Sequence, residues 1–357
     1  MNGDLKYKVI YVQKRIPLLQ NVVYKTQKEA IKAECTDIVL VQDEKTGLVY
    51  NAAFEPNRIM YVGEYQNEQG LSDVFKKHLV KVSEILDNKQ LLNGSIVEIG
   101  CGKGFFLEML LNKGVDVRGF DPAYEGNIPV ILKDLFSEKY NEINADTIIL
   151  RHVLEHIPDP LTFLHTVAQA NQYKGRVYIE VPSFDWIIKN NACEDIFYEH
   201  CNYFTPETLS HFFTASECGC LFGNQYFYLI ADFENLKKNL DTRSFVPSQI
   251  NMNETVERYS RFVATNRDIA LWGSGAKGVT FANLTDKQRI GIKCLIDINP
   301  MKQNKFIGGT GHPVIDPGQI VANGIKKVIV MNILYLEEIR SVLTPLGITP
   351  LTLNDVI

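Results

Sequence analysis

Hydrophobic and polar positions change their period along the chain, and the change predicts a β-rich start followed by a helix. Residues 1–70 carry short strand-like runs, YKVIYVQ and DIVLVQ, the latter followed by the turn DEKTG, and the helical period is absent there. From about residue 71 to residue 88, apolar residues recur three and four positions apart, as Phe75, Leu79 and Val82 show. We therefore expect a small β-rich module over residues 1–70 and a helix directly after it.

Two later blocks alternate strands and helices. In residues 95–232 the runs SIVEIG, DVRGFD, DTIILR, RVYIEVP and YFYLIADF read as strands, with FFLEMLL and PLTFLHTVAQA as helices between them. After a polar, helical connection over residues 235–265, DIALWG, KCLIDIN and KKVIVMN repeat the pattern. Such alternation predicts parallel sheets wrapped by helices. We expect an α/β protein with domains over residues 1–70, 71–234 and 235–357.

Length, charge and cysteine usage restrict the classes of function. A chain of 357 residues is more than one core usually holds. The net charge is -5 without a basic block, which argues against a nucleic-acid partner. No apolar run approaches the ~18–20 residues that span a bilayer. The first residues lack the charged segment followed by an apolar segment that marks a signal peptide. Seven cysteines, an odd count, argue against a disulfide framework. We expect a cytoplasmic protein with a small-molecule substrate.

The first glycine-rich loop, Glu98-Ile-Gly100-Cys-Gly102-Lys-Gly104, lies between a predicted strand and a predicted helix. Glycines let the backbone turn tightly and approach a ligand closely. The spacing differs from the dinucleotide fingerprint, because Phe105 stands where the third glycine would be, so the ligand need not carry a pyrophosphate. Asp121 ends the next predicted strand, where an acid is suited to binding two ribose hydroxyls.

These motifs resemble motifs I and II of class I S-adenosylmethionine-dependent methyltransferases, and residues 145–160, ADTIILRHVLEHIPDP, resemble their motif IV and the following loop. A strand-to-helix turn without a ligand would explain one such motif, but not three in order. The resemblance implies S-adenosylmethionine as the cofactor. The implied cofactor-binding residues are Glu98, Gly100, Gly102, Gly104, Phe105, Asp121, Pro122, Asp134, Leu135, Arg151, His152 and Val153.

Residues 195–205, DIFYEHCNYFT, together with the C-terminal block, resemble the three-domain C-methyltransferases that act on nucleotide-linked keto-deoxysugars. Carbon methylation beside a ketone needs a base for the α-proton, and a histidine is the natural one. The resemblance implies His200 as this base, with Glu199 and His156 beside it. The tyrosine of the family pattern is Phe197 here, and Tyr198 next to it is a further catalytic candidate.

A second loop, Gly273-Ser-Gly275-Ala-Lys-Gly278, has the dinucleotide spacing, and Asp297 ends the next predicted strand. Alone, it would suggest NAD. The loop and the following DINPMKQ also resemble the C-terminal block of the same methyltransferases, so we expect the helix N-terminus and Lys277 to face a substrate diphosphate. Residues 61–69 resemble the substrate entrance of that family. The expected substrate-binding residues are Tyr65, Asn67, Gln69, Asn202, Tyr203, Gly275 and Lys277.

Three functions stay open at this point. The first is methyl transfer to carbon on a nucleotide-linked keto-deoxysugar or related metabolite. The second is O- or N-methylation of a polar small molecule, which needs a base but no enolate. The third is a non-catalytic nucleotide-binding protein. The intact donor motifs and the Glu199-His200 pair count against the third.

The N-terminal module generates a prediction about metal. In the resembling family this module carries cysteine pairs that bind zinc, whereas residues 1–70 contain only Cys35 and the chain has no C-x-x-C. Because a closed zinc site needs four ligands, we expect no metal site and no stoichiometric zinc in the purified protein. Chelators should leave the melting temperature unchanged, because no folding free energy comes from zinc. Elemental analysis that finds about one zinc per chain after dialysis would contradict this.

Overall fold

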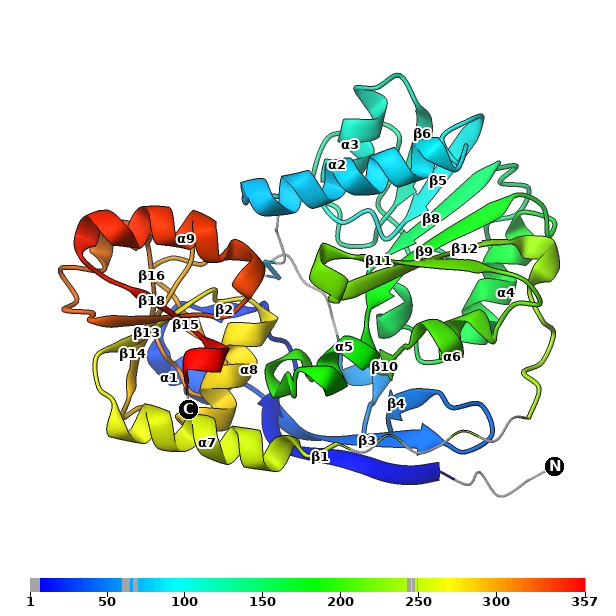
Figure 1. Ribbon diagram of the computed structural model, residues 1–357. Helices are drawn as coiled ribbons and strands as arrows, with labels where there is room; N and C mark the ends of the chain where they lie inside the picture. The colour runs from blue at the N-terminus through cyan, green and yellow to red at the C-terminus, as the bar shows by residue number, and fades with distance from the viewer. Residues whose placement is uncertain are drawn as a thin grey trace.

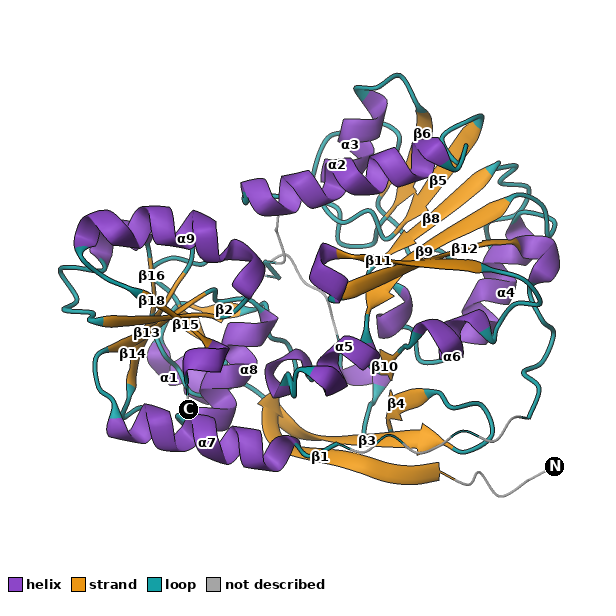
Figure 2. Ribbon diagram, viewed as in Figure 1, coloured by secondary structure: helices purple, strands orange, loops and turns teal. Residues whose placement is uncertain are grey.

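The computed structural model describes residues 7–59, 65–66, 70–242, 245, 248 and 250–356. Figure 1 shows two α/β bodies side by side, with the N-terminal strands, in blue, below them. Figure 2 shows that each body has a sheet at its centre and helices on its faces. The expected α/β class, with one sheet in each of the two later regions, is confirmed.

The larger sheet has seven strands in the order β11-β12-β9-β8-β5-β6-β7. Its strands are β5 (Ser95–Ile99), β6 (Asp116–Phe120), β7 (Ile131–Leu132), β8 (Thr147–Arg151), β9 (Arg176–Pro182), β11 (Glu217–Leu221) and β12 (Tyr226–Asp232). β12 runs antiparallel to β9 and β11, and the other pairs are parallel. The strand order reverses between β5 and β8, where open α/β sheets bind ligands.

Helices cover this sheet because their apolar stripes match its buried faces. They are α2 (Asp73–Asn88), α3 (Phe105–Leu111), α4 (Pro160–Ala170) and α6 (Pro206–Ser210). The helix α5 (Phe184–Lys189), which follows β9, instead buries its apolar residues in the core shared by the N-terminal strands and the C-terminal sheet. The Ser72 hydroxyl caps α2 by accepting a hydrogen bond from the Val74 N–H at 3.2 Å. The predicted stripe of Phe75, Leu79 and Val82 is buried in α2, which confirms the spacing argument.

The C-terminal sheet is entirely parallel, in the order β16-β14-β13-β17-β18. Its strands are β13 (Ile269–Trp272), β14 (Ile292–Ile296), β16 (Val314–Ile315), β17 (Lys327–Val330) and β18 (Pro350–Thr352), and its helices are α7 (Met252–Thr265), α8 (Ala276–Thr285) and α9 (Leu336–Leu343). The strand β18 is not among those that the sequence pattern predicts, because its three residues are too few to show a period.

The N-terminal region pairs with both α/β bodies. The strands β1 (Tyr7–Pro17), β3 (Cys35–Asp43) and β4 (Val49–Asn51) form a sheet that β10 (Asn202–Tyr203) completes, and β2 (Val23–Tyr24) pairs with β15 (Phe306–Ile307). The helix α1 (Gln27–Ile31) corrects our expectation that no helix lies here. Five residues show no period, but its capping box, Thr26 with Glu29, is visible in the sequence.

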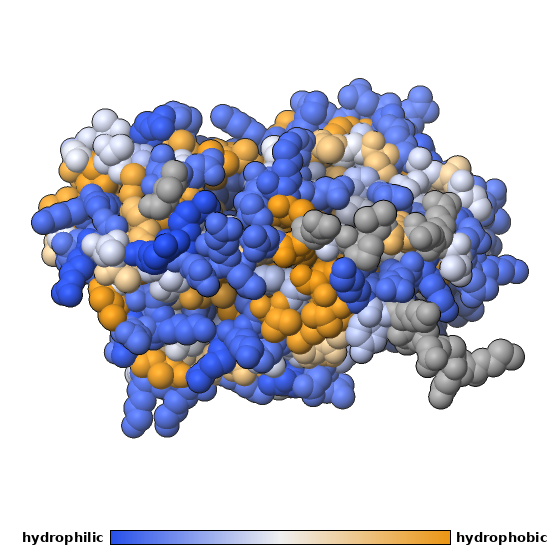
Figure 3. All heavy atoms as spheres, turned by 60° about the horizontal axis from the view of Figure 1, so that its bottom comes forward, coloured by the Kyte–Doolittle hydropathy of each residue, from blue (hydrophilic) through white to orange (hydrophobic). Residues whose placement is uncertain are grey.

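Across the described part of the chain, no helix has the length and apolar character needed to cross a membrane. The face of the molecule in Figure 3 is mostly hydrophilic, with hydrophobic side chains in separate groups.

Candidate active site

The loop after β5 needs its glycines for steric reasons. Gly100, Gly102 and Gly104 have φ values of 76°, 57° and 81°, in the left-handed region that favours glycine. A β-carbon on Gly100 would lie 2.3 Å from Val153 Cγ2, whereas nothing lies within 4 Å of one on Gly102. The loop therefore packs against the segment after β8 on one side and leaves open space at Gly102.

Asp121, at the end of β6, is fixed against this loop. Its carboxylate accepts hydrogen bonds from the backbone N–H groups of Gly102 and Ala123, both at 2.8 Å. Burial raises the pKa of Asp121, and these two hydrogen bonds oppose the shift. Each carboxylate oxygen keeps a lone pair, so Asp121 can accept two further hydroxyl donors at the position where a ribose is expected.

Glu98 is a buried acid with an unfilled position. One oxygen lies 3.8 Å from Arg151 Nη1, and Oε2 has no hydrogen-bond partner among the residues described. Burial raises the pKa of Glu98 to about 7, although the Arg151 charge lowers it. A buried acceptor without a partner is costly, so this carboxyl group suits the ammonium of a ligand.

Apolar side chains line the open edge beyond this loop. Phe105 and Leu135 are 38% and 62% exposed, and Pro122 is also exposed. Asp134 lies in the same region, but its carboxylate accepts a hydrogen bond from the Tyr140 hydroxyl at 2.6 Å and is thereby held to its own loop. The edge offers apolar contact for a flat ring.

A deep cleft separates the methyltransferase-like sheet from the C-terminal sheet, and residues from all three regions line it. Of the predicted site residues, it contains Tyr65, His152, His156, His200, Gly275 and Lys277. Asn67 and Gln69 lie outside the described residues. The cleft thus contains five of the eleven residues predicted for catalysis and substrate binding, together with His152 from the predicted cofactor site.

His200 and His156 meet edge to face in this cleft, with ring centroids 4.8 Å apart. Burial, with the charges of His156 and His152, holds the pKa of His200 well below its usual range. His200 is therefore neutral near pH 7 and can accept a proton. His156 Nδ1 lies 2.8 Å from the Glu199 carbonyl oxygen, which places the proton of His156 on Nδ1.

The hydrogen bonds of the Glu199 carboxylate are made to Gln20 and Tyr65, and not to His200. It accepts hydrogen bonds from the Gln20 N–H at 2.7 Å and from the Tyr65 hydroxyl at 2.6 Å. Burial raises the pKa of Glu199, although these two hydrogen bonds act to lower it. Glu199 therefore orients Tyr65, which lines the cleft.

Three predicted residues hold the segment 195–205 in place and do not line the cleft. The Tyr198 hydroxyl accepts a hydrogen bond from the Glu55 N–H at 2.8 Å. The Asn202 amide donates to the Ile157 carbonyl oxygen at 2.6 Å, and the Tyr203 hydroxyl accepts from a backbone N–H of its own loop at 3.2 Å. All three side chains are buried. The Tyr203 ring packs edge to face on His200, with centroids 6.2 Å apart, but the backbone takes the polar atoms of all three residues.

The second glycine loop forms the opposite wall. A β-carbon on Gly278 would lie 1.9 Å from the Gly273 carbonyl oxygen, so the third glycine lets α8 start close to β13. Asp297 accepts from the Ser274 N–H at 3.0 Å and the Ser274 hydroxyl at 2.5 Å. A β-carbon on Gly275 would meet nothing nearer than 3.7 Å. The loop therefore leaves space for a ligand at Gly275.

Two lysines lie at this loop in different environments. Lys277 Nζ forms an ion pair with Asp195 at 2.6 Å, so an acid of the other domain balances its charge. Lys302, which no motif assigned to the site, is buried and donates to Asn21 Oδ1 and the Ser274 carbonyl oxygen, both at 3.2 Å. Burial lowers the pKa of Lys302. Its position in the DINPMKQ run was the available signal.

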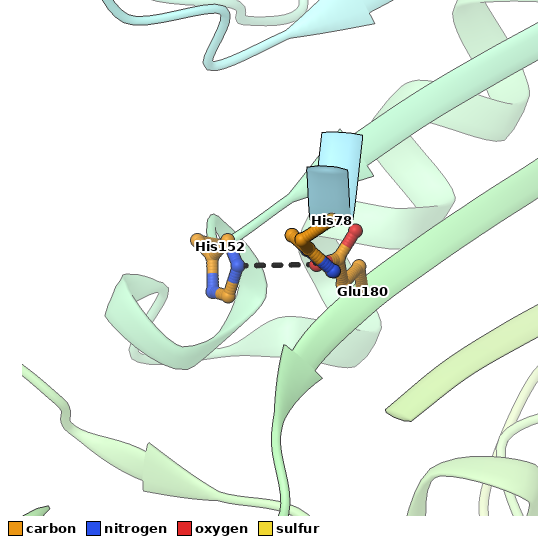
Figure 4. A group of neighbouring side chains, drawn as sticks. All are labelled: His78, His152 and Glu180. Atoms are coloured by element: carbon orange, nitrogen blue, oxygen red, sulfur yellow. Dashed lines mark hydrogen bonds and ion pairs between the residues drawn. The ribbon is translucent and has the colours of Figure 1, made fainter. Parts of the chain in front are cut away.

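A second group that the sequence analysis missed lies where β8 and β9 end. Figure 4 shows His78 and His152 grouped with Glu180, and a dashed line joins His152 to the Glu180 carboxylate. Glu180 lies 2.7 Å from His78 Nε2 and 3.0 Å from Arg151 Nε. Although burial opposes ionisation, Arg151 and the histidines hold the pKa of Glu180 well below its usual range. The signal was His78, a histidine on the apolar stripe of α2.

Two sets of side chains have the composition of a metal site. In each set, one nitrogen or oxygen atom per residue lies within 4.8 Å of the others. Two imidazoles and a carboxylate are ligands that divalent transition metals accept. The sets are His78, His152 and Glu180, and Glu155, His156 and His200.

Comparison with known proteins agrees with this geometry. Residues 71–219 match the family described as methyltransferase domain, and residues 248–346 match the C-methyltransferase C-terminal domain. The chain thus carries a class I S-adenosylmethionine-dependent methyltransferase domain, and the resemblance seen in its motifs is confirmed. The domain that follows is of the C-methyltransferase kind.

Individual relatives are similar over part of the chain. The C-methyltransferase NovU of Streptomyces niveus is 30% identical over 34% of this chain and 31% of its own length. The ubiquinone biosynthesis O-methyltransferases of Photorhabdus laumondii subsp. laumondii and Hydrogenovibrio crunogenus are each 28% identical, over 32% and 28% of this chain and 52% and 47% of theirs. The chain therefore spans between about a third and a half of the curated relatives it matches.

S-adenosylmethionine, the cofactor of this domain, fits the residues present. The unpartnered Glu98 oxygen suits its ammonium group, and Asp121 suits its ribose. The exposed apolar edge with Phe105 and Leu135 suits its adenine.

The donor site generates a prediction. Asp121→Ala should weaken binding of S-adenosylhomocysteine at least tenfold, which is ~1.4 kcal/mol, because the ribose loses a two-point acceptor. Calorimetry measures this directly. Asp116→Ala, an exposed change at the start of the same strand, is the control and should bind normally. Wild-type protein that binds no S-adenosylhomocysteine would contradict the site.

Proposed function

We propose that this protein transfers a methyl group from S-adenosylmethionine to a carbon beside a ketone, on a nucleotide-linked keto-deoxysugar or a related metabolite. The observation that carries the proposal is the neutral, buried His200 beside His156 in a cleft that joins the methyltransferase domain to a Rossmann-like loop. The similarity to a C-methyltransferase at 30% identity and the match of the C-terminal domain support it.

The residues on the methyltransferase side suit proton removal. His200 takes the α-proton of the acceptor, since its ring is uncharged and Phe197, 4.0 Å away between ring centroids, excludes water from one face. His156, with its proton held on Nδ1, and Tyr65, held by Glu199, position the acceptor in the cleft. When bound, S-adenosylmethionine supplies an electrophilic methyl group to the resulting carbanion.

The residues on the C-terminal side suit the nucleotide end of the acceptor. Gly275 leaves space at the N-terminus of α8, where backbone N–H groups attract phosphate. Lys302 is a buried cation next to the same loop, and Asn332 follows β17 on the other side of the switch point. A diphosphate fits this wall of the cleft while the sugar reaches His200.

Methyl transfer to oxygen is the second candidate, because two of the relatives are named O-methyltransferases. A screen of nucleotide sugars and cell extract with labelled donor, followed by mass spectrometry of the product, locates the methylated atom. Loss of a carbon-bound proton in D₂O without donor separates the two reactions, since only carbon methylation forms an enolate. A product labelled on oxygen or nitrogen would overturn the proposal.

The proposed base generates a prediction. His200→Ala should lower turnover by roughly 10²-fold or more, the usual contribution of a general base, with binding of S-adenosylhomocysteine intact. Turnover of the wild type should fall only in acid, as His200 takes up a proton below its lowered pKa. His165→Ala is the matched control, because His165 lies on α4 and bonds to Tyr173 and Lys237. Nearly full turnover in His200→Ala would place the base elsewhere.

The second glycine loop generates another prediction. Gly275→Val should raise the KM for the acceptor by roughly tenfold, or ~1.4 kcal/mol, because the valine methyl groups would occupy the phosphate position. Affinity for S-adenosylhomocysteine should not change. Ala322→Val, at an exposed turn, is the control. Stoichiometric NAD in the purified protein would contradict this interpretation.

A further inference from the structure

We propose that Glu155, His156 and His200 form a binding site for a divalent transition-metal ion such as Zn²⁺, with one coordination position open to the cleft. Each residue offers one ligand atom, and the three atoms lie within 4.8 Å of one another. The site goes beyond the proposed methyl transfer, because an ion can bind here without donor or acceptor. Its consequence for turnover rests on the proposed function, because His200 is also the proposed base.

Glu155 is a buried carboxylate that lacks hydrogen-bond donors. It is 1% exposed, and neither oxygen has a hydrogen-bond partner in the described part of the chain. His152 Nδ1 lies 3.4 Å from Glu155 Oε1, which is longer than the about 2.7–2.9 Å of a charge-assisted hydrogen bond. Buried charges are normally paired or coordinate metals. Glu155 therefore has the acceptor capacity that a cation at this position would use.

His156 is oriented by an outer hydrogen bond, as metal-binding histidines usually are. Its Nδ1 donates to the Glu199 carbonyl oxygen at 2.8 Å. Such a bond fixes the tautomer, so that the lone pair of the ring lies on Nε2. The carbonyl belongs to the residue before His200, so one backbone segment positions both imidazoles.

His200 is held in place by ring contacts. The centroid of its ring lies 4.0 Å from that of Phe197 and 4.8 Å from that of His156. The Phe197 side chain has no polar atom and therefore takes neither ring nitrogen. His200 thus completes the set with a nitrogen ligand that faces the other two residues.

The three ligands fit an ion of the zinc type. Zinc binds imidazole nitrogen and carboxylate oxygen at about 2.0–2.2 Å, so two of its ligands can lie up to about 4.4 Å apart, and small side-chain rotations close the remaining difference. Two histidines with one carboxylate form an open site, which keeps a fourth position for another ligand. Calcium and magnesium ions prefer oxygen ligands. All three residues line the cleft, so the fourth position faces it.

The other set, His78, His152 and Glu180, is less suited to a cation. Its carboxylate lies 2.7 Å from His78 Nε2 and 3.0 Å from Arg151 Nε, and Figure 4 shows how closely the two imidazoles approach it. The guanidinium already balances this carboxylate and repels a second cation. An ion that enters the cleft is therefore expected at Glu155 and not at Glu180.

The sequence-based expectation of no metal site considered the cysteine pairs of the N-terminal module, to which none of the three ligands belongs. Because a site with an open position does not enclose its ion, dialysis against a chelator removes the ion. Metal binding and proton removal exclude each other, since the ion takes the lone pair of His200 that accepts the α-proton. Zinc should therefore be a reversible inhibitor that competes with the acceptor.

The site can be tested without an acceptor. Full-length protein, treated with EDTA and dialysed, is titrated with Zn²⁺ in a calorimeter and with Co²⁺, whose visible absorption reports nitrogen and oxygen ligands. We expect about one ion per chain, bound with a Kd that is roughly micromolar or tighter. Glu155→Gln, His156→Asn and His200→Asn should each weaken binding roughly tenfold or more, while S-adenosylhomocysteine affinity and melting temperature stay as in wild type.

Two further variants locate the ion. His165→Asn, on α4 and outside the cleft, should bind zinc as wild type does. His78→Asn removes a residue of the other set and should also bind normally. Equal zinc affinity in Glu155→Gln, His156→Asn and His200→Asn would place the ion elsewhere and overturn the inference, as would loss of binding in His78→Asn alone.

Turnover separates this inference from the proposed function. With the keto acceptor found in the labelled-donor screen, Zn²⁺ should raise the apparent KM for the acceptor, and EDTA should restore it. If no ion binds while His200→Ala still lowers turnover, the metal site is wrong and the proposed function stands. If zinc binds at the three ligands and turnover does not change, the site stands and His200 is not the base.

Discussion

The pairing of the N-terminal segment with both α/β bodies is the constraint on which the site depends. β4 pairs with β10 of the methyltransferase region, and β2 pairs with β15 of the C-terminal region. Gln20, which lies between β1 and β2, donates its N–H to Glu199. Because the cleft is lined from all three regions, a change in either pairing would move His200 relative to the loop at Gly275. One core cluster joins the N-terminal strands to both bodies, which makes the cleft a rigid feature.

A mostly parallel sheet and an entirely parallel sheet meet at this cleft, each near the point where its strand order reverses. In the larger sheet the reversal lies between β5 and β8, and in the smaller one between β13 and β17. Loops at such points collect ligand-binding residues because neighbouring crossovers leave on opposite faces. Joining two switch points places the segment after β8 and the loop at Gly275 on the walls of one cleft.

The protonation of the histidines in the cleft depends on burial and on the partners of each ring. His200 packs against Phe197 and another histidine, so its neutral form is favoured. His152 lies a few residues from His156 in the chain but between two carboxylates, so its cationic form is favoured. The same element, the segment after β8, therefore lines the cleft with two histidines in different electrostatic surroundings.

Local sequence patterns were enough to predict the α/β class, the methyltransferase domain and its cofactor. The motifs around Glu98 and Asp121 depend on strand–turn–helix geometry within a few residues, and local geometry follows from local composition. The third glycine of the second loop was predictable for the same reason. Three other features depend on long-range packing. Tyr198 and Tyr203 bond to the backbone, Glu199 holds Tyr65, and burial favours the neutral form of His200. The Gln20–Glu199 bond joins residues 179 positions apart, and a pKa depends on burial and neighbours that no local pattern encodes.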